Sequence, residues 1–130
     1  MPEQVQFPVP RFGKMLDQLR AAGLETRNAR GSWGGITPAG GIVATAWTDQ
    51  PAGDGRFLIK RPRTNHGGLK AAWDTGSLRV GTELRLILIH PRGQPAPNGR
   101  RQIKDAALMP QTWRVVEVID DAQAIVERCA

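Results

Sequence analysis

The stretch TELRLILIH, residues 82–90, is the part of the sequence that decides the fold. One face of this stretch carries three alternating leucines, Leu84, Leu86 and Leu88. The other face becomes apolar in its second half, through Ile87 and Ile89. Because a strand that is apolar on both faces is typically central in its sheet, we expect residues 82–90 to form a central strand.

Two pairs of segments, one before and one after this stretch, predict hairpins. Residues 42–48 (IVATAWT) alternate β-branched or aromatic residues with small ones, and RFLIK at 56–60 follows the turn residues AGDG at 52–55. Residues 112–119 (TWRVVEVI) and 123–129 (QAIVERC) are separated by Asp-Asp-Ala, which predicts a terminal hairpin. With the central strand, these segments make about five strands.

The N-terminal part predicts a helix over residues 11–22. Its apolar residues recur with the spacing i, i+3, i+4 and i+7, as Phe12, Met15, Leu16 and Leu19. Gly23 suits the left-handed conformation that ends a helix. Residues 31–41 contain five glycines and a proline and are expected to be loop.

Residues 91–110 predict a long basic loop rich in proline. The segment contains four prolines, an Asn-Gly pair and four basic residues, Arg92, Arg100, Arg101 and Lys104. A structureless loop of that length is uncommon in a small domain and is usually functional or mobile. The residues KDAALM at 104–109 could add a helical turn.

These elements predict one α+β domain over residues 1–130, with an extended lead-in at 1–10. We expect a small antiparallel sheet or open barrel of about five strands, with one N-terminal helix packed on it. The pattern indicates no βαβ unit. The single cysteine, Cys129, excludes an intramolecular disulfide. No secretory signal or membrane-spanning stretch is visible, so a cytoplasmic location and no membrane partner are expected.

Charge is unevenly distributed along the chain. The formal net charge is +6, but residues 56–104 hold eleven Lys or Arg against two acids, Asp74 and Glu83, which gives this segment +9. A basic middle segment suggests a polyanionic partner, either a nucleic acid or an acidic protein. The alternative is compositional, since fourteen of the eighteen basic residues are arginine.

The stretch RPRTNHGGLKAAWD, residues 61–74, predicts an anion site at the start of a short helix. The backbone N–H groups of Gly67 and Gly68 would meet the anion, and Arg61, Arg63 and Lys70 would add charge. The alternative is structural: Asn65 caps the helix, the glycine pair makes the turn, and the arginines are solvated. No phosphate-binding motif of the GK[ST] or GxGxxG type decides between them.

Four tryptophans and no tyrosine suggest stacking platforms for a single-stranded nucleic acid. Trp33 and Trp73 would serve if they are exposed, and Arg100 and Arg101 would bind phosphate. The alternative is that tryptophans fill the core, which is the expectation for Trp47 and Trp113 and is also favoured for Trp73.

Catalytic signatures are weak. Neither serine lies in a G-x-S-x-G motif, no metal-binding spacing is present, and Cys129 is expected to be half-buried packing. Asp120-Asp121 indicates a turn. A metal-independent ribonuclease needs little more than a histidine beside cations, and His66 near Arg61, Arg63 and Lys70, or His90 near Arg92, could fill that role.

The composition and motifs therefore favour non-enzymatic binding of a nucleic acid or another polyanion through residues 56–104. No cofactor is expected. A protein-interaction module that docks an acidic partner is the first alternative, and a small metal-independent ribonuclease with His66 as the catalytic residue is the second.

Overall fold

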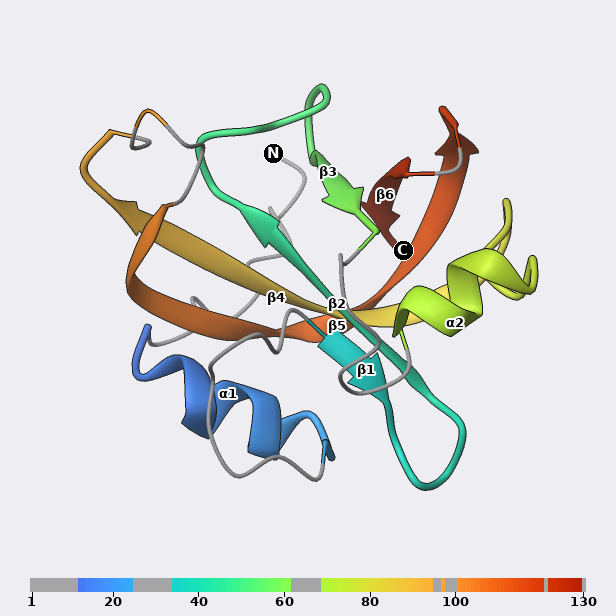
Figure 1. The fold of residues 1–130 in the computed structure, drawn as a ribbon, viewed down its shortest axis with the longest axis horizontal. Coiled ribbons are helices and arrows are strands. Elements are labelled where there is room, and N and C mark those ends of the chain that lie inside the picture. The colour runs from blue at the N-terminus through green and yellow to red at the C-terminus, as the bar shows by residue number, and fades with distance from the viewer. Residues whose placement is uncertain are drawn as a thin grey trace, which may run out of the picture.

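The computed structural model describes residues 12–24, 34–61, 69–94, 97, 101–120 and 122–129. Within these ranges the elements are, in chain order, α1 (Met15–Ala21), β1 (Gly34–Ile36), β2 (Ile42–Trp47), β3 (Arg56–Lys60), α2 (Leu69–Asp74), β4 (Glu83–Arg92), β5 (Gln102–Val118) and β6 (Gln123–Arg128) (Figure 1). The strands form one six-stranded sheet in the order β1-β2-β4-β5-β6-β3. The chain is therefore α+β, as expected, with a larger sheet than expected.

Strand β4 is central, as the sequence predicts. It pairs with β2 on one side and with β5 on the other. Leu84 and Leu86 are buried in one core on one face, while Ile87 and Ile89 are fully buried in a second core on the opposite face. The alternating side chains of β4 thus contribute to two separate cores, one on each face of the sheet.

The first core lies inside the curl of the sheet. Strands β2 and β3 stand far apart in the strand order, yet they are in contact, because the sheet bends round without closing. The curl follows the 17-residue β5, which sweeps round the molecule in Figure 1. Trp73 and Leu78, from α2 and the segment after it, pack into this core against residues of five strands. Helix α2 therefore covers part of the inner face.

The second core lies under α1. Met15, Leu19 and Leu24 pack against Val43 of β2 and the two isoleucines of β4. The helix begins at Met15, four residues later than the predicted start at residue 11, and Gly23 has a φ of 95°, which only glycine adopts readily. The expected packing of the N-terminal helix on the sheet is confirmed.

The predicted hairpin between residues 42–48 and 56–60 is wrong. Strand β2 pairs antiparallel with β1 and parallel with β4, whereas β3 pairs antiparallel with β6. The turn residues at 52–55 lie in the segment that connects β2 to β3, next to an isolated bridge between Pro51 and Phe57. The parallel pair makes the sheet mixed, and its crossover contains β3 and α2, a connection that the sequence pattern did not indicate.

The glycine-rich segment 31–41 is also not entirely loop. Residues 34–36 form the short edge strand β1, which returns to β2 through a turn closed by hydrogen bonds between Thr37 and Gly41. Gly34 and Gly35 are buried, and α2 lies against this strand. Glycine lets the two backbones approach closely at this edge.

The predicted loop over residues 91–110 is largely strand. Strand β4 runs to Arg92 and β5 begins at Gln102, so KDAALM is extended and not helical. Pro91 is tolerated because β2 ends opposite Ile89, and no neighbour on that side needs its missing N–H. Pro110 lies in the irregularity between the pairs of Arg85 and Ile87, where ladder hydrogen bonds are already interrupted.

The terminal hairpin is confirmed: β5 and β6 pair antiparallel from Trp113 to Val118. A side-chain oxygen of Asp120 accepts a hydrogen bond from the N–H of Ala122 at 2.8 Å, as in the predicted turn. No helix in the described part of the chain is long and apolar enough to cross a membrane.

We expect Leu86→Ala to lower the free energy of unfolding by about 2–5 kcal/mol, because it truncates a fully buried side chain in the first core. Val80→Ala is the control, since Val80 is 63% exposed and its truncation should change stability by less than about 0.5 kcal/mol. Urea denaturation followed by tryptophan fluorescence measures both. Equal effects of the two substitutions would contradict the assignment of β4 as the central strand.

Candidate functional site

Six of the residues predicted to bind an anion or nucleic acid or to act in catalysis lie outside the described part of the chain: Trp33, Arg63, His66, Gly67, Gly68 and Arg100. Asn65, the predicted helix cap, and Asp121 of the predicted turn lie outside it as well. The anion site at the glycine pair therefore stays a prediction. Four others, Arg61, Lys70, Trp73 and Arg101, can be placed.

Arg61 and Lys70 converge on one carboxylate. The Nε atom of Arg61 lies 3.0 Å from Oδ1 of Asp74, and Nζ of Lys70 donates a hydrogen bond to Oδ2 at 2.7 Å. The hydrogen bond from Lys70, with the charge of Arg61 adding to it, lowers the pKa of Asp74. Helix α2 and its end at Gly76 follow the prediction, but two of the cations expected to hold an external anion already share an internal one.

Trp73 would serve as a stacking platform only if its ring were exposed, and that condition is not met. The side chain of Trp73 is 9% exposed and packs in the first core. Trp113 is 5% exposed and packs there too, at a tilt to Phe57, as expected for a core tryptophan. Burial on the inner face of the curl leaves neither ring free for a nucleobase.

Arg101 is held by the end of β2. Its guanidinium donates to both carboxylate oxygens of Asp49, one at 3.0 Å, and lies 4.6 Å from the centroid of the Trp47 ring. This hydrogen bonding lowers the pKa of Asp49 and raises that of Arg101. Only 10% of the Arg101 side chain is exposed. These contacts connect the start of β5 to the end of β2. They favour a role for Arg101 in holding the two strands together over phosphate binding, the role predicted for it.

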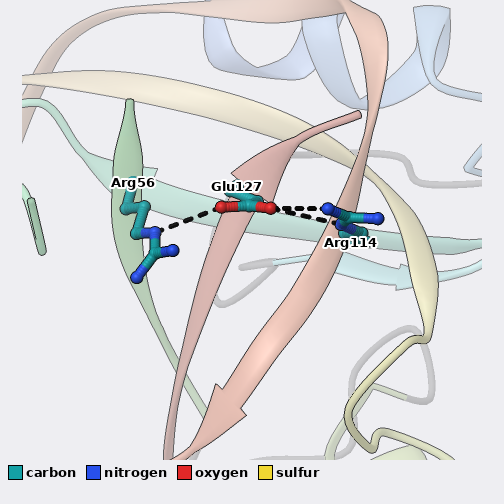
Figure 2. A network of polar contacts seen from close by, with 3 residues as sticks. All are labelled: Arg56, Arg114 and Glu127. Carbon is teal, nitrogen blue, oxygen red and sulfur yellow. Dashed lines mark hydrogen bonds and ion pairs between the residues drawn. The ribbon is translucent and has the colours of Figure 1, made fainter. Parts of the chain in front are cut away.

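A third ion-pair network crosses β3, β6 and β5. Glu127 lies between Arg56 and Arg114, with Oε2 accepting from Arg56 at 3.1 Å and Oε1 accepting from Arg114 at 2.7 and 3.3 Å (Figure 2). The hydrogen bond from Arg114, with that from Arg56, lowers the pKa of Glu127. The same hydrogen bond raises the pKa of Arg114. Arg56 belongs to the basic segment, and its charge is countered by an acid from outside that segment.

A different arrangement occurs where β4 and β5 meet at the end of the sheet. Nδ1 of His90 lies 2.7 Å from Oδ1 of Asp105, its direct partner across the two strands. The ring of Phe12 stacks on the His90 ring with a centroid distance of 3.9 Å and an interplanar angle of 14°. The side chains of His90 and Asp105 are 41% and 29% exposed. The His90 side chain is thus in contact through one nitrogen and one side of its ring, and the rest of it is partly exposed to solvent.

Two exposed cations accompany this pair. Arg92 follows His90 by two residues on the same strand and so projects from the same face. Lys104 occupies the irregularity where the pairing jumps from Asp105 to Ile103, and such bulges re-aim a side chain. Neither cation has an ion-pair partner within the described ranges. We call Phe12, His90, Arg92, Lys104 and Asp105 the His90 cluster.

The sequence indicated only part of the His90 cluster. His90 near Arg92 is visible as a short spacing on one strand. Asp105 and Phe12 come from distant segments, and they meet His90 only through the register of β5 on β4 and the bridge from Gly13 to Ala106. Residue 105 lies in the segment expected to be loop, so no strand alternation there pointed to it.

Other reactive groups in the described ranges have simpler surroundings. Cys129 is a free, half-buried thiol at the end of β6. The hydroxyl of Ser77 lies 3.0 Å from that of Thr75 in the turn after α2. No group of three or more histidines, cysteines or acids that could hold a metal ion is found among the residues described.

No protein-family model, curated protein or solved structure matches the chain.

We expect Glu127→Gln to lower the melting temperature at pH 7, because it removes the charge that Arg56 and Arg114 share. A lowered folded-state pKa means that this stabilisation is present above the unfolded-state pKa and is lost as pH falls through the folded-state value. The difference from the wild-type protein should therefore shrink as pH falls below the ordinary value of 4.5. Thermal denaturation between pH 7 and pH 3 measures it.

Glu117→Gln is the matched control, because Glu117 is an exposed residue of β5 with the same charge and no ion-pair partner in the described ranges. It should leave the melting temperature nearly unchanged at every pH. A difference for Glu127→Gln that is constant with pH would contradict the role of the ion pairs.

Proposed function

We propose that the chain binds single-stranded nucleic acid at the His90 cluster, with phosphates on Arg92 and Lys104 and a base beside the stacked rings. The observation that supports this most is the contrast in charge pairing. Arg56, Arg61, Lys70 and Arg101 of the basic segment are each paired with a carboxylate, whereas Arg92 and Lys104 are not paired within the described ranges.

The other cations of the basic segment fit a binding role less well. Lys60 at the end of β3 and Arg79 before β4 also lack a described ion pair, but each is at a separate place in the fold. Arg85 donates to the backbone oxygen of Met109 at 3.2 Å. Arg92 and Lys104 are different because they lie on paired strands at one end of the sheet, so one strand of phosphates could meet both.

The stacked rings favour a nucleic acid over an acidic protein as the partner. Proteins that bind single strands combine a cationic track with aromatic side chains on which bases stack. Phe12 and His90 supply aromatic surface beside the two cations, and the His90 ring keeps a substantial exposed area. An acidic peptide would use the charges but has no planar base for the rings.

The test is fluorescence anisotropy with a labelled single-stranded oligonucleotide at several salt concentrations. Binding should be micromolar or weaker at physiological salt, with little base discrimination, as for other binders that act mainly through phosphate contacts. Duplex of the same sequence should bind less tightly, because its bases are not free to stack. No binding at low ionic strength, or a preference for an acidic peptide over the oligonucleotide, would overturn the proposal.

We expect the double variant Arg92→Ala/Lys104→Ala to flatten the log–log salt dependence by about one to two units, since each phosphate contact contributes about one. The same titration measures it.

Arg79→Ala is the matched control, because it removes an exposed arginine that precedes the start of β4, whereas His90 lies near the end of that strand. An equal change of slope in the control would mean that general charge, and not the His90 cluster, governs binding.

A further inference from the structure

We propose that His90 is the general base of a metal-independent RNA-cleaving site, in which Asp105 is a positioning residue. This inference rests on the binding of single-stranded nucleic acid proposed above and assigns chemistry to the same cluster. It is carried by the surroundings of His90: a carboxylate on one ring nitrogen, a stacked ring on one face, and a side chain still 41% exposed.

The contact with Asp105 fixes which nitrogen can accept a proton. A carboxylate only accepts hydrogen bonds, so in the neutral imidazole Nδ1 carries the proton that it donates across 2.7 Å. The other nitrogen, Nε2, then keeps its lone pair. Among the residues described, no group binds Nε2. The free nitrogen is thus in the form that a general base requires.

The stack with Phe12 holds the ring in place. Phe12 precedes Gly13, whose N–H and C=O both form 2.8 Å hydrogen bonds with the backbone of Ala106. Ala106 is next to Asp105, so the segment that carries the stacked ring is tied to the strand that carries the positioning carboxylate. A base that is held in one orientation loses less freedom in reaching the transition state.

Arg92 and Lys104, for which the described ranges hold no ion-pair partner, complete the site. Arg92 lies on the same face of β4 as His90, and Lys104 is adjacent to Asp105 in the sheet irregularity. Cations beside a phosphodiester stabilise the negative charge that grows on its oxygens as the phosphorus is attacked.

The reaction is an internal transesterification of RNA. The proton of a 2′-hydroxyl passes to Nε2 of His90 while its oxygen forms a bond to the adjacent phosphorus, and the bond from phosphorus to the 5′-oxygen breaks. Water protonates the leaving 5′-oxygen, and the resulting hydroxide takes the proton back from His90. The products are a 2′,3′-cyclic phosphate and a 5′-hydroxyl, and no oxidant, reductant or metal takes part.

Other acid or nucleophile positions in the described ranges do not offer this arrangement. Both oxygens of Glu127 are occupied by arginines, as are those of Asp49, so neither carboxylate is free to accept a proton. The contacts of Ser77 include another hydroxyl and no histidine. The His90 cluster combines a base, an orienting acid and two cations that have no ion-pair partner in the part of the chain that the structure describes.

The test compares two labelled oligonucleotides in EDTA, one of DNA throughout and one with a single ribonucleotide. The wild-type protein should bind both and cleave only the second, at the ribonucleotide, leaving a 2′,3′-cyclic phosphate. His90→Ala should lower the cleavage rate, measured at saturating protein concentration, at least about 100-fold, a loss that weaker binding cannot cause under that condition. Added imidazole should restore part of the rate.

Asp105→Asn tests the positioning role through a signal that a merely structural role would not move. Long-range ¹H–¹⁵N NMR spectra should show Nδ1 protonated in the wild-type protein, and the tautomer balance should change in the variant together with a roughly tenfold slower cleavage. Arg79→Ala should cleave at the wild-type rate.

The outcomes separate the two proposals. Binding without cleavage by the wild-type protein would overturn this inference and leave the proposed function standing, whereas absence of binding would overturn both. Cleavage that persists in His90→Ala, or that is lost in His66→Ala but not in His90→Ala, would also overturn the assignment of His90.

Discussion

The fold depends on β4 being buried on both faces. A strand with Leu84 and Leu86 on one side and Ile87 and Ile89 on the other needs an apolar partner on each side. The curl of the sheet provides one, and α1 provides the other. Because β4 is paired with β2 as far as Ile89 and with β5 as far as Arg92, His90 directly follows a stretch that is held on both edges, and a site there would rest on a rigid base.

Charge along the sequence and charge on the folded surface are different quantities in this chain. The basic excess of residues 56–104 is partly cancelled by acids that the fold brings in from outside, Asp49 onto Arg101 and Glu127 onto Arg56. A pair as exposed as that of Arg56 with Glu127 contributes little stability individually. The effect of these ion pairs on recognition is larger, because they leave fewer cations available to a polyanion.

The parts of the fold that local pattern determines could be predicted from sequence. The central strand, the N-terminal helix, the second short helix and the terminal hairpin each follow from periodicity and turn residues within a few positions. Strand partners did not follow, because nothing in residues 56–60 says that they pair with β6 and not with β2. The prolines also led to a wrong prediction of loop over residues 91–110. Pro91 and Pro110 lie in strands, at places where the neighbouring strand has ended or the pairing is irregular, so that the missing N–H is tolerated. The candidate site was half visible for the same reason, since His90 and Arg92 are local to each other and Asp105 and Phe12 are not.

The contacts of Gly13 and Gln18 with β5 have a consequence for the solubility of the chain. Strand β6 pairs with β5 only from Trp113 onward, so the first half of β5 has a backbone edge that no named strand covers. Gly13 satisfies both backbone groups of Ala106 on that edge, and the side-chain oxygen of Gln18 accepts the N–H of Leu108 at 2.9 Å. An unpaired edge is a template for strand addition by another copy. The segment leading into α1 thus covers part of the edge of β5 that another copy could otherwise pair with, and its removal would leave the backbone groups of Ala106 without these partners.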